Sequence, residues 1–557
     1  YNIFGGTQDN NTQGGPSRTL RRDGISNSDW FVLLGGDGHQ PATEPNNPNI
    51  VYAQSQEGYL NRIDRTTGEV VNIRPQEGID EPYERFNWDS PILVSHHNPK
   101  TIYFGSQRVW KSNNRGDSWT PISKDLTKDE ERFALPIMGR VQSIDNAWDV
   151  YAMSTYNTIT SISESKLDSN IIYIGTDDGI IQYTKNGGQK WTKITVDQLP
   201  KTPASAFVND IKTDLFDPNI AYICLDNHKF GDYQPYLFKS LDGGKTWKKI
   251  TNGIPENTLI WRIIQDHVNP NLLFLGTEYG VYVSLNQGEK WHKFSNGLPT
   301  IPVRDLTIQR RENDLVLATF GRSFYVLDDY SPIRSFSENS LNQEAVLFEP
   351  RKALQYTPEI GGTRSDGSAS FKRENPKYGT TISYYIRDGY KSLTQKRNEL
   401  ENSKGIDPNT LEKLNEAGYN FKNIHDAEIS EIKAKTKMEE KSIKEVLKAI
   451  EKQQSNKEDI PFKGWKTLDN EKIEDQPEIL IEITNQKGDV VKQIIKPLKK
   501  GLNRTNWDLS TFNTTVVKAS DKGEKSWRYG GAMYKEVPPG TYNIKIFKRE
   551  GIALTFL

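Results

Sequence analysis

The sequence predicts an all-β protein: a multi-bladed β-propeller followed by a smaller β-sandwich that carries a small helical insertion. Three observations lead to this prediction. A short apolar strand recurs at intervals of about 50 residues, which is the length of one four-stranded propeller blade. A turn motif recurs in step with this strand. In the last third of the chain the repeat gives way to strands separated by turn signals.

The repeated strand follows an Asn- and Pro-rich turn and ends in a small residue. It recurs at 48–53, 98–105, 168–175, 217–222, 269–276 and 313–318. The aligned aromatic positions 52, 103, 173, 222 and 274 are 51, 70, 49 and 52 residues apart. This spacing predicts about six blades up to residue 330, with 3–9 as tail strands of another. Because a propeller closes when its first and last blades pair, we expect the chain, which begins at Tyr1 within a strand, to be truncated or processed there.

The turn motif reads Ser/Thr-x-Asp/Asn-x-Gly-x-x-Trp and is an Asp-box. Its four copies are Ser112, Asn114, Gly116 and Trp119; Thr184, Asn186, Gly188 and Trp191; Ser240, Asp242, Gly244 and Trp247; and Ser284, Asn286, Gly288 and Trp291. The Asp or Asn side chain closes a tight turn onto backbone N–H groups, Gly supplies a positive φ, and Trp packs between sheets. Since three of the four copies carry Asn, we expect these residues to be structural rather than catalytic.

Composition restricts the classes of function. The 557-residue chain carries 72 basic and 73 acidic residues, so its formal net charge of −1 would not attract nucleic acid or an anionic membrane. No apolar stretch approaches the roughly 18 residues of a membrane helix. The single cysteine, Cys224, lies in an apolar run and is expected to be a buried thiol. A large chain without disulfides favours a bacterial source.

The blade repeat stops near residue 330, and a different organisation follows. We expect 1–335 to form the propeller, 336–389 a linker with the first strands of an Ig-like domain, 390–456 a helical insertion and 457–557 the rest of that domain. The order of a strand, the Gly-x-Asn-x-x-x-Trp-Asp segment 501–508 and the Pro-Gly-x-Tyr strand 539–546 carries this assignment. It resembles the Ig-like domain that closes many secreted bacterial proteins.

The insertion is predicted to be helical. Asp407-Pro408 forms a helix start, and apolar residues recur at helical spacing between 443 and 450. Residues 405–419 resemble the start of a helix-hairpin-helix domain, a type that often binds nucleic acid through a Gly-containing hairpin. The corresponding hairpin, 436–438, has no glycine, and residues 401–453 carry 10 Lys and no Arg against 11 acids. We therefore expect a spacer or a protein contact rather than nucleic-acid binding.

Several further segments carry a resemblance to a known family. They are 5–10 (GGTQDN), 14–19 (GGPSRT), 29–31 (DWF), 35–38 (GGDG), 85–89 (RFNWD), 175–179 (GTDDG), 321–322 (GR) and 327–329 (LDD). Over residues 1–550 the chain resembles the large sortilin-like, Asp-box (BNR-repeat) "glycosyl hydrolase" propeller proteins secreted by Bacteroidota. The resemblance implies a secreted or surface-exposed propeller and brings little specific chemistry.

The segment from Trp30 to Gly58 is also similar in layout to the first blade of xyloglucanases made of two Asp-box propellers. The position that matches the catalytic Asp of that family is Gln56, which can serve neither as acid nor as base. Asp37 and Glu57 are the neighbouring candidate catalytic residues, and either would have to act from a different geometry. Sialidases also carry Asp-boxes, but they need an arginine triad that has no counterpart here.

Metal and cofactor chemistry has little support in the sequence. The seven histidines and one cysteine show no zinc-ligand spacing, and no phosphate-binding Gly loop with Lys follows a strand. Asp177 and Asp178 could bind Ca²⁺ through clustered oxygens, with a polar hairpin turn as the alternative reading. We expect no cofactor apart from Ca²⁺ at this pair.

These observations favour a secreted or cell-surface bacterial protein that binds a peptide, a partner protein or a glycan through loops on one propeller face. The candidate binding residues are Trp30, Asp37, His39 and Arg140. Two alternatives stay open: an endo-acting polysaccharide hydrolase resembling the xyloglucanases, and a structural subunit of an outer-membrane assembly. An enzyme needs two carboxylates facing one cleft, whereas a glycan binder is expected to present exposed aromatic rings without them.

Overall fold

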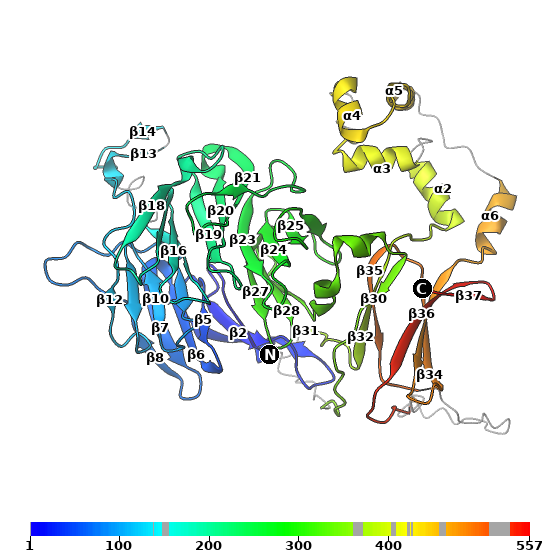
Figure 1. The fold of residues 1–557 in the computed structure, drawn as a ribbon, viewed down its shortest axis with the longest axis horizontal. Coiled ribbons are helices and arrows are strands. Elements are labelled where there is room, and N and C mark those ends of the chain that lie inside the picture. Colours follow the sequence, from blue (N-terminus) through cyan, green and yellow to red (C-terminus); the bar gives the residue numbers. More distant parts are fainter. Residues whose placement is uncertain are drawn as a thin grey trace. The chain divides into compact units, whose positions relative to one another are not determined.

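The computed structural model describes residues 2–137, 139–146, 155–359, 371–402, 408–419, 424, 427–455, 464–511 and 535–557. Strands dominate this part of the chain, so the all-β prediction is confirmed (Figure 1). The chain divides into two compact units, each formed by two segments. Unit 1 comprises Tyr1–Glu338 and Tyr356–Lys377, and unit 2 comprises Asn339–Gln355 and Tyr378–Leu557.

Unit 1 contains, among its described residues, seven antiparallel sheets of three or four strands that follow one another along the chain. The first three sheets are β1 (Asn2–Gly6), β2 (Thr12–Pro16) and β4 (Phe31–Leu34); β5 (Ala42–Glu44), β6 (Asn47–Ser55), β7 (Tyr59–Asp64) and β8 (Glu69–Asn72); and β9 (Ile92–Val94), β10 (Ile102–Gly105), β11 (Val109–Ser112) and β12 (Thr120–Pro121). The fourth and fifth sheets are β15 (Ile159–Glu164), β16 (Ile172–Thr176), β17 (Ile180–Thr184) and β18 (Trp191–Thr195); and β19 (Phe207–Thr213), β20 (Ala221–Asn227), β21 (Asp232–Ser240) and β22 (Lys248–Lys249). The last two sheets are β23 (Ile260–Gln265), β24 (Leu273–Thr277), β25 (Gly280–Ser284) and β26 (His292–Phe294); and β27 (Val303–Gln309), β28 (Asp314–Thr319) and β29 (Phe324–Leu327).

Consecutive sheets pack face to face in a propeller-like arrangement. The innermost strands β5, β9, β15, β19, β23 and β27 each pack on the next in this order, and β2 and β4 of the first sheet pack on β6. The seventh sheet meets the first through Phe324, whose ring stacks on Trp30 at a centroid distance of 6.0 Å. The guanidinium of Arg18 also pairs with Asp314 at 2.7 Å. Side-chain packing therefore joins the two ends of the series of sheets.

The Asp-box turns are closed by their own side chains. In the first copy, Ser112 Oγ donates to Asn114 Oδ1 at 2.8 Å and accepts from the Gly116 amide at 2.8 Å. Asn114 Oδ1 also accepts from the amide of Ser118, and the other three copies repeat the pattern of bonds. Gly116 has φ +89°, and a Cβ there would lie 2.6 Å from Ile73. The turn therefore requires glycine for both its conformation and its close packing.

Two short pairings lie outside the seven sheets of unit 1. β13 (Pro136–Ile137) and β14 (Arg140–Val141) form a hairpin, and β3 (Ile25–Ser26) pairs with β31 (Lys372–Arg373). The second pairing belongs to a longer contact in which Glu359 and residues 371–375 bond to residues 19–27. For example, the amides of Arg22 and Glu359 donate to the carbonyls of Glu359 and Leu20, both at 2.9 Å. After residues 339–355 in unit 2, the chain thus returns to unit 1, where it holds residues 19–27, before β4, in place.

Unit 2 is built around two antiparallel sheets. One contains β30 (Ala345–Leu347), β32 (Thr380–Ile386) and β35 (Gly501–Trp507), and the other contains β33 (Glu478–Thr484), β34 (Val490–Pro497), β36 (Asn543–Glu550) and β37 (Ala553–Phe556). Their inner faces share one hydrophobic core, to which Ile382, Ile481 and Ile546 contribute. Alternating apolar residues on paired strands bury one face of each sheet, which produces a two-layered β-sandwich.

Helices lie between β32 and β33 in the sequence. They are α2 (Leu393–Asn402), α3 (Pro408–Glu416), α4 (Ile429–Thr436), α5 (Glu440–Ser455) and α6 (Trp465–Lys472). α3, α4 and α5 share a small core that includes Leu414, Ile432 and Ile443. Between α4 and α5, Lys437 takes a left-handed conformation with φ +56°, where a helix-hairpin-helix turn would be expected to carry glycine.

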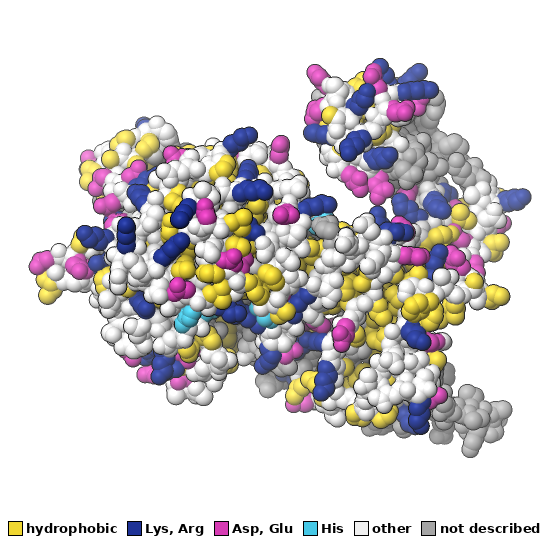
Figure 2. Space-filling model, in the orientation of Figure 1, with side chains coloured by type: hydrophobic (Ala, Val, Ile, Leu, Met, Phe, Trp, Pro, Cys, Tyr) yellow, Lys and Arg dark blue, Asp and Glu magenta, His cyan; other side chains and the backbone are white. Residues whose placement is uncertain are grey.

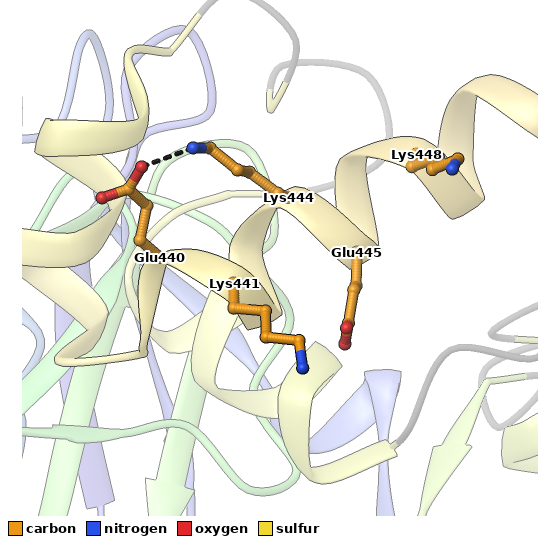
Figure 3. A pocket seen from close by; sticks show the side chains of 5 residues that line it. All are labelled: Glu440, Lys441, Lys444, Glu445 and Lys448. Atoms are coloured by element: carbon orange, nitrogen blue, oxygen red, sulfur yellow. Dashed lines mark ion pairs between the residues drawn. The ribbon is translucent and has the colours of Figure 1, made fainter.

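The surfaces of both units mix charges of opposite sign. Figure 2 shows basic and acidic side chains interspersed over the visible face. A hollow beside α5 is lined by Glu440, Lys441, Lys444, Glu445 and Lys448 (Figure 3). Glu440 and Lys444 form an ion pair in which both side chains are about half exposed, so this pair contributes little to stability. None of the described helices is both long and apolar enough to cross a membrane.

Candidate functional site

Each of the second to seventh sheets of unit 1 has one edge where its second and third strands are joined, and the antiparallel order places the start of its innermost strand at that same edge. We call this edge the upper rim, and the opposite edge the lower rim. The turns of the upper rim in the second to seventh sheets are 56–58, 106–108, 177–179, 228–231, 278–279 and 320–323. In the first sheet the turn 7–11 lies beside them, since the Asp9 amide donates to Asp37 and the Asp37 amide donates to Gln56.

At four of these turns an exposed aromatic ring lies in the turn or directly after it. Tyr59, Phe230, Tyr279 and Phe320 are 51%, 70%, 46% and 71% exposed. In the last three a glycine of positive φ follows the ring directly, so a short turn holds the ring out from the sheet. Exposed aromatic rings on turns are suited to contact a ligand, because they offer a large rigid surface at small conformational cost.

A tryptophan and an arginine stack between these aromatic turns. Trp261 lies in β23, is 4% exposed, and donates from Nε1 to Glu278 Oε2 at 3.2 Å. The guanidinium carbon of Arg304, at the start of β27, lies 3.6 Å from the indole centroid. The ring of His228 meets the indole edge-on at 5.7 Å. Together with Asp226, which bonds His228 Nδ1, these residues form what we call the rim cluster.

The rim cluster sits within the fifth, sixth and seventh sheets, beside three of the exposed rings. Phe320 donates its amide to the carbonyl of Pro302, two residues before Arg304, and the Glu278 amide donates to Leu259, two residues before Trp261. Phe230 and Tyr279 follow His228 and Glu278 closely in the sequence. These backbone bonds place the aromatic turns around the Trp261–Arg304 stack.

The stack keeps a cation available to a ligand. Arg304 is exposed, and within the described residues it forms no hydrogen bond or ion pair, so its N–H donors face water. The protein nevertheless desolvates part of the guanidinium, since the indole covers one face of it, and this desolvation lowers the pKa of Arg304. The nearby charge of Arg262 lowers the pKa further, whereas Asp226 and Glu278 act in the opposite direction. A guanidinium stacked on an indole retains its in-plane donors. The cluster can therefore donate several hydrogen bonds to hydroxyl or carboxylate oxygens.

Three of the sequence-predicted residues meet on the upper rim. Asp37 is buried, accepts from the amide of Asp9 at 2.9 Å and donates its own amide to Gln56 Oε1 at 3.2 Å. His39 is half-buried, and burial lowers its pKa against the opposing charges of Asp89 and Asp37. Glu57 follows Gln56 in a left-handed conformation with φ 53° and is exposed. Asp37 and Glu57 thus flank the position that matches the xyloglucanase acid.

The other two predicted binding residues lie elsewhere. Trp30 packs against Gly15 and stacks on Phe324 where the first and seventh sheets meet, so its ring belongs to the packing between sheets. Arg140 is exposed on β14 of the separate β13–β14 hairpin. The structure therefore does not bring Trp30 or Arg140 together with Asp37 and His39.

The Asp177–Asp178 pair is held by protein donors. Asp177 accepts from the amide and hydroxyl of Thr158 at 2.8 and 2.6 Å, and Asp178 accepts from Thr176 Oγ1 and from the Lys128 amide. Among the described residues, no group of three or more His, Cys, Asp or Glu has the arrangement of a metal site. Burial raises the pKa of Asp177 to about 7, although the bonds from Thr158 lower it.

Because of this raised pKa, the mutation Asp177→Asn should stabilise unit 1 increasingly as pH rises. The folded chain keeps the Asp177 proton up to about pH 7, whereas the unfolded chain releases it near pH 4. The free energy of unfolding of the natural protein therefore falls between these values, by up to about 4 kcal/mol for this group. We expect Asp177→Asn to be more stabilising at pH 8 than at pH 5 by roughly 2–3 kcal/mol in urea unfolding followed by tryptophan fluorescence, since only about a third of the loss has developed by pH 5.

Asp242→Asn provides the control for this titration. Hydrogen bonds from Thr246 lower the pKa of Asp242 to about 2, so the carboxylate is charged in both states throughout pH 5–8. Its effect on stability should be the same at both pH values. An Asp177→Asn effect that is equally independent of pH would contradict the raised pKa.

The residues of the rim cluster were missed by the sequence reasoning. A signal existed in the recurrence of an aromatic residue directly before a turn glycine, at Phe230-Gly231, Tyr279-Gly280 and Phe320-Gly321. This pattern follows the second strand of the repeat and is independent of the Asp-box. The stack itself could not be read in this way, because its two residues belong to different sheets.

No family model and no curated protein matches the sequence. Partial likenesses among solved structures include an ancestral GH74 enzyme (15% identity, TM-score 0.36), the β-propeller domain of Myceliophteria thermophila Cps50 (Swd1) (11%, 0.31) and the extracellular domain of a protein described as a one-component system from B. thetaiotaomicron (16%, 0.36). The alignments cover 68%, 48% and 58% of this chain and 46%, 72% and 37% of those chains, respectively. This chain thus spans less than half the length of the ancestral GH74 enzyme.

Proposed function

We propose that this chain is a secreted or cell-surface bacterial binding protein whose upper rim holds a glycan. The observation that carries the proposal is the Trp261–Arg304 stack beside the exposed rings of Phe230, Tyr279 and Phe320. The exposed rings of the turns would contact the apolar faces of sugar rings, and the guanidinium of Arg304, held in place by Trp261, would donate to their oxygens. The assignment to the sortilin-like Asp-box proteins of Bacteroidota is part of the same proposal.

The arrangement of the rim favours a glycan over a folded protein partner. The exposed rings stand singly among polar turn residues such as Gln56, Lys229 and Arg322, whereas a protein interface is commonly a contiguous patch with an apolar core. Separate rings on successive sheets suit an extended ligand that contacts each ring with a different unit. A peptide or protein ligand remains the alternative result of the binding test.

Binding to a panel of soluble polysaccharides that includes β-glucans and xyloglucan would test this function. In affinity electrophoresis we expect at least one member to retard the protein. Phe320→Ala, Tyr279→Ala and Arg304→Ala should each weaken that binding by roughly 5–30-fold, which corresponds to about 1–2 kcal/mol. Because these side chains are exposed, the melting temperature should change little.

Phe216→Ala is the matched control, since Phe216 is an exposed aromatic residue on a turn of the lower rim. It should bind like the natural protein. The proposal would be contradicted if Phe216→Ala lost as much affinity for the polysaccharide as the upper-rim variants, or if the natural protein bound none of the polysaccharides. Stable co-purification with other chains instead would favour a subunit of an outer-membrane assembly.

A hydrolase is the second candidate, because Asp37 lies beside Gln56, the position that matches the catalytic acid in the xyloglucanase resemblance. The same polysaccharides should therefore be assayed for released reducing ends. Release that Asp37→Asn or Glu57→Gln abolishes, with folding unchanged, would replace the binding proposal by an endo-acting polysaccharide hydrolase.

A further inference from the structure

Four basic or titratable residues occupy corresponding turns of the lower rim. His96, Lys166, His267 and Arg310 lie where the innermost strand is joined to the second strand in the third, fourth, sixth and seventh sheets. In the fourth, sixth and seventh sheets the innermost strand has a bulge, directly followed by Ser161, Arg262 and Asp305, respectively. The cluster residue comes five positions later in each of these three sheets. We call these four residues the lower-rim cation cluster.

The cluster turns of the third and fourth sheets are in direct contact, and His267 in the sixth sheet contacts Arg334 of the segment 331–335. The His97 imidazole nitrogen Nε2 lies 2.9 Å from the carbonyl of Ser165, directly before Lys166. Glu164 accepts from the His96 amide at 3.1 Å. On the other side, Arg334 Nη2 lies 3.4 Å from the ring nitrogens of His267.

The nearby acids are already occupied inside the sheets. Glu164 is buried and accepts from Ser95 Oγ, the His96 amide and Tyr103 Oη. Asp266 is fully buried and accepts from Arg334, Tyr330 and backbone amides. Most of their lone pairs are therefore taken by these donors, although Asp266 Oδ1 also lies 3.7 Å from Nδ1 of His267.

The two permanently charged residues of the cluster, Lys166 and Arg310, have no such partners among the described residues. Lys166 and Arg310 are exposed, and in the described part of the chain neither forms a hydrogen bond or an ion pair. Four residues that carry or can take a positive charge therefore gather at one edge of a chain whose overall charge is close to zero.

Lys166 and Arg310 both act electrostatically on the two imidazoles of the cluster. Burial is the largest cause of the lowered pKa of His96. Arg310, Lys166 and His97 lower this pKa further, whereas the negative charge of Glu164 raises it. For His267, burial is again the largest cause of the lowered pKa. The negative charge of Asp266 raises this pKa, whereas the positive charges of Arg334, Arg310 and Lys166 lower it further. Lys166 and Arg310 thus influence both imidazoles, as expected for side chains arranged around a common space.

We propose that the lower-rim cation cluster binds a tetrahedral oxyanion, a sulfate or phosphate group, either free or carried on a glycan. Arg310 and Lys166 supply charged donors, and the two imidazoles add N–H donors from neighbouring turns. A bound dianion stabilises the imidazolium forms, so binding takes up protons and strengthens as pH falls toward 6. The site is distinct from the upper rim and does not depend on the function proposed there.

Isothermal titration calorimetry of the full chain tests this site, with sodium sulfate, sodium phosphate and a sulfated heparin oligosaccharide as probes. Titrations at pH 6.5 in two buffers of different ionisation enthalpy measure the protons taken up. For sulfate and the sulfated oligosaccharide, whose charge does not change in this range, we expect binding with net proton uptake and affinity lower by about tenfold at pH 8. Phosphate loses a proton of its own when it binds as the dianion, so its net proton uptake should be smaller. Tighter binding of the oligosaccharide than of free sulfate would identify a glycan-borne group, and equal affinities would identify the free ion.

The double variant Lys166→Gln/Arg310→Gln should weaken binding at least roughly tenfold, because it removes both permanent charges. His96→Gln/His267→Gln should abolish most of the proton uptake. Arg311→Gln is the matched control, since the neighbouring Arg311 pairs with Glu312 at 3.0 Å, and it should bind normally. Absence of binding by all three probes, or equal loss in Arg311→Gln and the double variant, would overturn the proposal.

Discussion

Replacing Asp266 by alanine should lower the free energy of unfolding of unit 1 by about 3–5 kcal/mol. Asp266 is fully buried and pairs with Arg334 at 2.7 Å, accepts from Tyr330 Oη at 2.6 Å and accepts from the Asn269 amide at 2.7 Å. The alanine would leave the largely buried Arg334 guanidinium without its counter-charge. Urea unfolding followed by tryptophan fluorescence at pH 7 measures the loss.

A second variant separates the pair from general disruption. In Asp266→Ala/Arg334→Met the unpaired charge is also removed, so much of the lost stability should return. If the double variant were as unstable as the sum of its two single variants, the buried charge would not be the cause of the loss.

Trp291→Ala should have a comparable effect, about 3–5 kcal/mol, and a larger one than the same change at another Asp-box. Trp291 is 2% exposed, belongs to the core between the fifth and sixth sheets and donates from Nε1 to the Ile250 carbonyl at 2.8 Å. Trp191 occupies the same motif position and makes the corresponding bond to Ile122, but it is only partly buried. Its loss leaves a smaller cavity.

Thermal and urea unfolding of Trp291→Ala and Trp191→Ala would measure this difference. We expect about 1–2 kcal/mol for Trp191→Ala, since less apolar area is lost there. Equal losses at the two positions would mean that the motif, rather than burial, decides how much each tryptophan contributes.

The parts of the structure that the sequence predicted well are local. An Asp-box closes through bonds between residues two to four positions apart, such as Ser112 with Asn114 and Gly116, so its form can be read from a short segment. The apolar strands repeat for the same reason, because each blade must bury its own faces. Asp37 and His39 could be placed on the upper rim because they precede an innermost strand.

The rest depends on contacts between distant segments. Trp261 and Arg304 become neighbours only because β23 and β27 pack side by side, and no local pattern carries that information. Trp30 looked like a binding residue because it precedes the Gly-rich turn 35–38, but its ring fills the space above Gly15. Arg140 lies in a hairpin outside the blade repeat, so the repeat could not position it.

The contact between the first and seventh sheets has a consequence for biosynthesis. Each sheet can pair its strands as soon as some 50 residues have been made. The joint around Trp30 and Phe324 must wait for residues nearly 300 positions apart. Glu359 and residues 371–375 reach residues 19–27 only after the chain has entered unit 2. During synthesis, the first sheet therefore stays without its contacts to the seventh sheet and to the residues after 355 until those residues have been made. Residues synthesised late thus complete the packing of residues synthesised first.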